Sequence, residues 1–135
     1  MHGITSFTHE FSLRVPYADT DQMGMVYYAN YLKFLEEART EYLAERGISV
    51  KELSQHGTLF VVARQEIDYK FPAFYGDSLQ INTKIGNIGG VRIEFQYEIK
   101  NQNGQIISKA KTILVCVDKD LKPKAIPEEV RKLLP

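Results

Sequence analysis

Five stretches of the chain have the hydrophobic pattern of β-strands. In most of them apolar and polar residues alternate, as in a strand that buries one face, and turn residues separate the stretches. The stretches are residues 7–15, 57–71, 79–85, 91–100 and 105–117. Asn103-Gly104 stands between the last two and favours a tight hairpin turn. The pattern therefore predicts five strands, with antiparallel neighbours late in the chain.

Between the first and second stretches the apolar spacing changes to three and four residues, which is typical of a helix packed on a core. The apolar stripe contains Tyr28, Tyr31, Leu32, Leu35, Ala38, Tyr42 and Leu43. The other face is charged, and Gly47 is a suitable stop for a helix of roughly five turns. Residues 50–55 and 127–134 predict two shorter helices. One long helix across one face of an antiparallel sheet is an α+β fold.

Asp19, Asp21 and Gly24 lie in a polar, turn-rich loop that joins the first strand to the long helix. A helix N-terminus presents unpaired backbone N–H groups and a partial positive charge, which suit it to polarise a carbonyl or hold an oxyanion. An acid beside that terminus can attack a carbonyl or activate water. Aspartates are also common helix caps and turn residues, so the spacing by itself leaves both roles open.

Length and charge exclude several classes of protein. The chain has 135 residues, of which 44% are hydrophobic, so we expect a single domain over residues 1–135. The 17 basic residues equal the 17 acidic residues, which disfavours binding to nucleic acid or to an anionic membrane. The N-terminus has no signal-peptide pattern, and no window reaches the roughly 18 to 20 apolar residues of a membrane helix. We therefore expect a cytoplasmic protein.

The cysteine and the histidines do not form a recognisable site. Cys116 is the only cysteine and falls in the apolar run ILVCV, which indicates a buried strand residue. The three histidines, His2, His9 and His56, are far apart and have no cysteine at ligand spacing, so no metal site is predicted. His9 is in phase with the apolar face of the first strand, which favours a core or strand-end role. No G-x-S-x-G motif supports a serine hydrolase.

The loop and the helix together resemble a known family. The run D-T-D-Q-M-G-M-V-Y-Y-A-N-Y-L, followed by F-L-E-E-A-R-T-E-Y-L, is similar to the signature of the 4-hydroxybenzoyl-CoA thioesterase branch of the hotdog-fold acyl-CoA thioesterases, especially its bacterial short-chain members. The likeness is dense over residues 15–43, and D-Y-K-F-P-A-F-Y-G-D-S-L resembles the strand that follows the helix in that family. Beyond Asp77 the likeness rests on strand pattern and order.

This resemblance implies a site and an assembly. Asp21, the second acid of the D-x-D pair, would be the catalytic nucleophile or general base, and Gly24 matches a glycine of the family's site. The backbone N–H of Tyr28, at the start of the helix, would bind the thioester oxygen. Family members carry either His or Tyr at that position, so the role of the Tyr28 side chain stays open. The family's five-stranded sheet wraps around the helix, and its members form homodimers or homotetramers with sites at the subunit interface.

The resemblance also implies where the substrate binds. Tyr69, Lys70 and Phe71 would line the acyl pocket by analogy, although ordinary strand packing explains the same residues equally well. Arg64, Lys70 and Arg92 are the candidates for contacts with the phosphates of coenzyme A. The implied reaction is hydrolysis of a small or medium acyl-CoA to the free acid and CoA. It uses no metal and no bound cofactor, because coenzyme A is part of the substrate.

Two other functions share the same fold. A hotdog dehydratase uses an active-site histidine beside an acid, and no histidine occurs between His9 and His56. A non-catalytic hotdog domain would bind acyl-CoA or acyl-carrier protein as a regulator or scaffold. The D-x-D pair and Gly24 argue against this second function, because binding alone does not require an acid beside the carbonyl.

Overall fold

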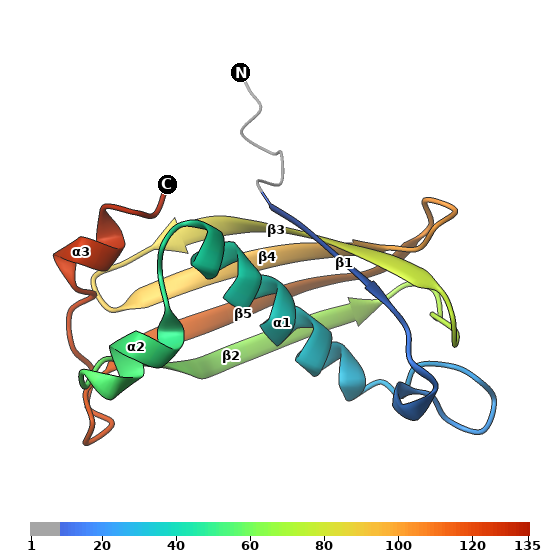
Figure 1. Ribbon diagram of the computed structural model, residues 1–135, viewed down its shortest axis with the longest axis horizontal. Helices are drawn as coiled ribbons and strands as arrows, with labels where there is room; N and C mark the ends of the chain where they lie inside the picture. The colour runs from blue at the N-terminus through green and yellow to red at the C-terminus, as the bar shows by residue number, and fades with distance from the viewer. Residues whose placement is uncertain (1–8) are drawn as a thin grey trace.

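The computed structural model describes residues 9–135 and has the predicted strands and helices in the predicted order (Figure 1). The elements within these residues are β1 (His9–Arg14), a 3₁₀ turn η1 (Tyr17–Asp19), α1 (Asn30–Glu45), α2 (Val50–Gln55), β2 (Leu59–Tyr69), β3 (Ser78–Ile88), β4 (Arg92–Lys100), β5 (Ile106–Val117) and α3 (Glu128–Arg131). The first predicted strand began at Phe7, and residues 7 and 8, like His2, lie outside the described residues.

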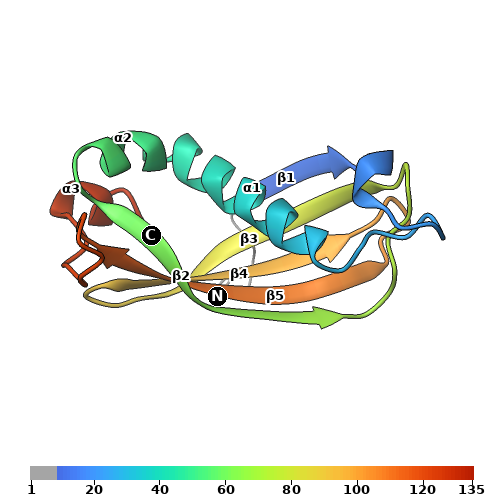
Figure 2. The same cartoon turned by 90° about the horizontal axis from the view of Figure 1, so that it is seen from below.

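The strands form one antiparallel sheet with the order β1-β3-β4-β5-β2. The hairpin between β4 and β5 closes with a bond from Asn101 N to Gln105 O at 3.1 Å. Gly104 follows the turn with a φ of 76°, a conformation that a glycine adopts without strain. Figure 2 shows the sheet curving beneath α1, so the predicted α+β hotdog arrangement is confirmed.

The core lies between α1 and the inner face of the sheet. The buried residues of α1 are Tyr31, Phe34, Leu35, Ala38, Tyr42 and Leu43. The prediction is wrong for two residues of the apolar stripe, which are not buried: Tyr28 is 62% exposed and Leu32 is 46% exposed. The helix begins only at Asn30, so Tyr28 belongs to the turn before it. Phe34, which the predicted stripe did not include, is buried on the helix.

The predictions for Cys116 and His9 are confirmed. Cys116 is fully buried on β5, and burial raises the pKa of its thiol above the usual value against the opposing charge of Lys124. His9 is 8% exposed and its Nε2 lies 2.6 Å from Glu45 Oε2 at the last residue of α1. This contact ties β1 to the C-terminal end of the long helix.

The helix does not cover the sheet evenly. α1 packs on β1 and β3, whereas β2 is the opposite edge strand of the sheet. Val62 pairs with the buried Leu114 and so points to the inner face, yet it is 50% exposed, as is Tyr69. A bulge between Val62 and Arg64 interrupts the register of this strand. The uncovered inner face of β2 borders the site described next.

No helix within residues 9–135 is long and apolar enough to cross a membrane.

Candidate active site

The acidic loop folds back on itself between β1 and α1. Thr20 and Val26 form an antiparallel bridge, and Met25 pairs with Phe74 from the segment before β3. Gly24 turns the chain with a φ of 80°. A side chain at this position would meet no atom within 4 Å, so the glycine is required by backbone conformation and not by space.

Asp21 uses one carboxylate oxygen to hold this loop. Its Oδ1 accepts hydrogen bonds from Met23 N at 2.9 Å and from Met25 N at 3.2 Å. The Asp21 N–H in turn donates to Met25 O at 2.8 Å. Asp21 therefore closes a turn, as one of the sequence interpretations has it. Among the described residues nothing bonds to its second oxygen, Oδ2, which remains available for chemistry.

Asp19 has a different environment. It is 6% exposed, and its Oδ1 accepts from Lys33 Nζ at 2.6 Å. Its carbonyl oxygen accepts from Tyr27 N at 3.0 Å and from Asn30 Nδ2 at 2.9 Å. Asp19 thus packs the loop against the first turn of α1, whereas Asp21 keeps a free oxygen.

The start of α1 has no side-chain cap. Ala29 occupies the N-cap position without a side-chain hydrogen bond, so neither Asp19 nor Asp21 caps this helix. The Asn30 N–H donates to Tyr27 O at 2.8 Å, and the next two amides donate to the next two carbonyls. The N–H groups of Tyr28 and Ala29 donate to no group in the described residues. They are the free amides that a helix N-terminus offers to an anion or a polarised carbonyl.

A groove of about 350 Å³ is lined in part by Tyr28, the residue that carries the first of these amides. The residues that line it are Met25, Val26, Tyr28, Tyr31, Tyr69, Lys70, Phe71 and Pro72. The Tyr69 hydroxyl donates to Tyr28 O at 3.3 Å, and the Tyr31 and Tyr69 rings stand edge to face with centroids 5.4 Å apart. Burial raises the pKa of both phenols above the usual value, so both hydroxyls are protonated at neutral pH, as an unperturbed tyrosine also is.

The structure brings most of the predicted site residues together. Tyr28, Tyr69, Lys70 and Phe71 share the groove. Met25 links it to Asp21, because Met25 N donates to Asp21 Oδ1 and Met25 O accepts from Asp21 N. Tyr31 also lines the groove, although the apolar spacing of α1 marked it only as a core residue. The approach of Tyr69 to Tyr28, 41 positions apart, has no signal in the sequence.

The two arginines predicted to bind phosphate lie away from this groove. Arg64 is exposed on β2 and pairs with Glu66, with Nε 2.9 Å from Oε2. Arg92 is the first residue of β4 and lies opposite Val115 of β5, whereas Tyr69 lies opposite Ser108. Seven residues along a strand span roughly 23 Å at about 3.3 Å per residue. One chain therefore does not bring Arg92 to the groove.

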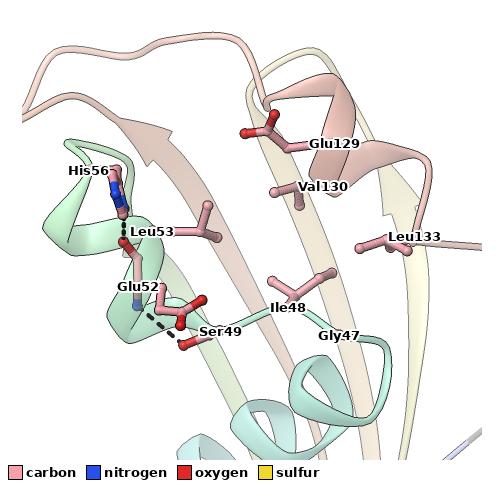
Figure 3. Close-up of a pocket in the computed structure, with 9 residues that line it drawn as sticks. All are labelled: Gly47, Ile48, Ser49, Glu52, Leu53, His56, Glu129, Val130 and Leu133. Atoms are coloured by element: carbon pink, nitrogen blue, oxygen red, sulfur yellow. Dashed lines mark hydrogen bonds between the residues drawn. The ribbon is translucent and has the colours of Figure 1, made fainter.

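A second hollow, of about 300 Å³, lies between α2 and α3 at the other end of the molecule (Figure 3). Ile48, Leu53 and Val130 supply apolar side chains to this hollow. His56 Nδ1 is 2.8 Å from the carbonyl oxygen of Glu52, so this ring nitrogen already has a hydrogen-bond partner. In residues 9–135 no three His, Cys, Asp or Glu side chains gather closely enough to hold a metal ion.

Comparison with known proteins assigns the chain to a family. Residues 15–134 match the thioesterase-like superfamily, and the chain belongs to it. The predicted resemblance to the hotdog-fold thioesterases is thereby confirmed. The fold is also that of a 1,4-dihydroxy-2-naphthoyl-CoA thioesterase from Synechocystis, with a TM-score of 0.87 and 26% identity, covering 93% of this chain and 94% of the other.

Curated relatives resemble the chain along nearly its whole length. An acyl-CoA thioesterase, YbgC, from Haemophilus influenzae is 40% identical over 123 residues, which cover 90% of each chain. The acyl-CoA thioester hydrolase YbgC of Escherichia coli is 37% identical over 119 residues, covering 87% of this chain and 89% of the relative. These relatives and the chain thus share one thioesterase architecture.

Proposed function

We propose that this thioesterase hydrolyses small or medium acyl-CoA thioesters to the free acid and CoA. The observation that carries the proposal is the free Oδ2 of Asp21 at the same loop and helix junction as the unpaired amides of Tyr28 and Ala29. An attacking carboxylate and donors for a carbonyl oxygen are the two groups that thioester cleavage needs. The activities named for the relatives support the same substrate class.

The Tyr28 N–H polarises the thioester carbonyl in this proposal, and the acyl group occupies the groove lined by Tyr69 and Phe71. The Asp21 carboxylate then attacks the carbonyl carbon, the C–S bond breaks, and the CoA thiolate leaves and takes a proton from water. Water hydrolyses the resulting acyl-aspartyl anhydride. The chain supplies the carboxylate and the amides, so we propose no metal and no cofactor apart from the coenzyme A of the substrate.

Asp21 can instead act as a general base that deprotonates an attacking water. We favour direct attack because a nucleophile needs only approach geometry, whereas a base must also position the water. A single turnover in ¹⁸O-water with enzyme in excess distinguishes the two. Hydrolysis of the anhydride at the aspartyl carbonyl puts label into the peptide that contains Asp21, which mass spectrometry detects. Label confined to the released acid leaves the general-base mechanism standing, because it excludes hydrolysis at the aspartyl carbonyl.

Release of free thiol from a panel of acyl-CoAs of increasing chain length tests the function itself. Hydrolysis that is fastest for short and medium chains supports the proposal, and binding without thiol release identifies an acyl-CoA or acyl-carrier-protein scaffold. Hydration of an enoyl-CoA in the same preparation identifies a dehydratase. The position of His9 beside Glu45, at the far end of α1 from the acidic loop, argues against a dehydratase.

We further propose that the active form is a homodimer, or a tetramer of two such dimers, paired along β2. This strand is 11 residues long and lies at the edge of the sheet, where one side of its backbone pairs with no strand from residues 9–135. Such an edge, with an exposed Val62 beside it, is a ready surface for a second copy. The partner's copies of Arg64 and Arg92 are then candidates for contacts with the CoA phosphates, in addition to Lys70 in the chain's own groove.

Sedimentation tests this assembly. We expect Val62→Glu to convert the oligomer to a monomer, because pairing would bury the new charge. The matched control is Leu121→Glu, since Leu121 is 67% exposed in the turn after β5. A Val62→Glu protein that keeps the wild-type mass would place the interface elsewhere.

A further inference from the structure

Two contacts fasten the acidic loop to the first turn of α1. Asp19 carries a carboxylate whose side chain is 9% exposed, and the ammonium of Lys33 lies 2.6 Å from it. The Lys33 side chain is 49% exposed, so it reaches inward from the helix surface to a nearly buried acid. The second contact is the bond from Asn30 Nδ2 to the Asp19 carbonyl at 2.9 Å.

These contacts surround the proposed oxyanion donors. The Asp19 carbonyl accepts from Tyr27 N and from the Asn30 side chain. The free amides belong to Tyr28 and Ala29, the two residues between them. One carbonyl oxygen therefore fixes both ends of the short segment that presents the amides.

Asp19 also lies close in the chain to the proposed nucleophile. Asp21 is two residues after Asp19, and the intervening Thr20 is bridged to Val26. Asp19 is two residues from the reacting carboxylate, and it is bonded to α1 through both its side-chain and its main-chain oxygens. A shift of Asp19 changes the distance between Asp21 and the Tyr28 amide.

We propose that Asp19, Lys33 and Asn30 form a clamp of positioning residues that sets the distance from the Asp21 carboxylate to the amides at the start of α1. The inference rests on the proposed function, since it concerns the geometry of that reaction. None of the three residues lines the groove, so the clamp acts on the rate of the chemical step and not on substrate binding. Loss of the Lys33 ammonium leaves the buried Asp19 carboxylate without its cation. We expect the loop then to move so that water can hydrate that carboxylate.

Lys33→Met is the principal test, because it removes the cation and keeps the apolar stem. A displacement of about 1 Å in a reacting group costs on the order of 10²-fold in rate. We expect kcat to fall about 10- to 100-fold and KM to change less than about threefold. Lys33→Arg keeps the charge and should restore most of kcat. Asn30→Ala, which removes the other contact, should lower kcat in the same direction.

Glu45→Gln is the matched control. Glu45 also forms a 2.6 Å contact with a nearly buried partner, His9, but at the opposite end of α1. A general loss of helix anchoring would lower the melting temperature of both variants, whereas loss of the clamp lowers kcat only in Lys33→Met. We therefore expect Glu45→Gln to keep the wild-type kcat.

A double variant keeps the test valid if Lys33→Met folds poorly. Asp19→Asn/Lys33→Met removes the buried charge together with its cation, so it should fold better than Lys33→Met. Its kcat should stay low because the ionic contact that fastens the loop to α1 is still missing. The clamp is disproved by a Lys33→Met protein with kcat within about twofold of the wild type, or by an equal fall in Glu45→Gln. A wild-type protein that releases no thiol from any acyl-CoA would instead disprove the proposed function.

Discussion

Asp21→Asn should lower kcat by on the order of 10³-fold or more while the protein keeps its fold. The amide has the shape of the carboxylate, and its oxygen can still accept from the Met23 and Met25 N–H groups that Oδ1 now binds. The loop therefore keeps its turn. The variant loses the negative oxygen that, in the proposed reaction, attacks the carbonyl or takes a proton from water. Thiol release at saturating acyl-CoA measures kcat, and the melting temperature reports the fold.

Asp19→Asn is the control for this result. Asn keeps the main-chain carbonyl that binds Tyr27 and Asn30, and it loses only the charge paired with Lys33. We expect a fall in kcat about 10- to 100-fold, well short of that in Asp21→Asn. Near-normal turnover in Asp21→Asn, together with an inactive Asp19→Asn, would transfer the chemical role to Asp19.

Tyr28→Pro should lower kcat by on the order of 10² to 10³-fold, because it removes the N–H that we propose polarises the thioester carbonyl. The turn can accept proline at this position. Asn30 N donates to Tyr27 O at 2.8 Å, which makes Tyr28 the second residue of a four-residue turn, a site that proline favours. The Tyr28 N–H donates to no group in the described part of the chain, so the substitution breaks no bond within it.

Tyr28→Phe separates the backbone from the hydroxyl. It keeps the N–H and the ring that lines the groove, so we expect kcat within about threefold of the wild type. Steady-state rates for the two variants, with circular dichroism to confirm the helix, complete the comparison. A Tyr28→Phe protein as impaired as Asp21→Asn would give the phenol a chemical role.

Local patterns in the sequence determined the elements of this fold. The alternation in residues 79–85 and 91–100 predicted β3 and β4, because a strand exposes alternate side chains to opposite faces. The spacing of Leu35, Ala38 and Tyr42 predicted the buried face of α1 for the same kind of geometric reason. The pattern missed the start of the helix, since the apolar Tyr28 is in phase with the stripe but belongs to the preceding turn.

The sequence also marked the acidic loop, but its spacing alone did not distinguish the two aspartates, and only the family resemblance assigned the catalytic role to Asp21. Both residues suit a turn or a cap, and both lie next to the helix. Only the tertiary structure shows Asp19 nearly buried against Lys33 and Asp21 with a free oxygen. Lys33 is 14 positions from Asp19, too far for any local pattern to pair the two.

The sequence by itself therefore determined the strands, the long helix, the family and the loop that carries the acid, because each depends on residues close together in the chain. The tertiary structure decided which aspartate is free, which amides remain unpaired and which side chains form the groove. Those properties depend on contacts across long separations, such as the 41 positions between Tyr28 and Tyr69. This contact forms only when folding brings the end of β2 to the start of α1. Burial and hydrogen bonding depend on such neighbours in space and not on neighbours in the chain.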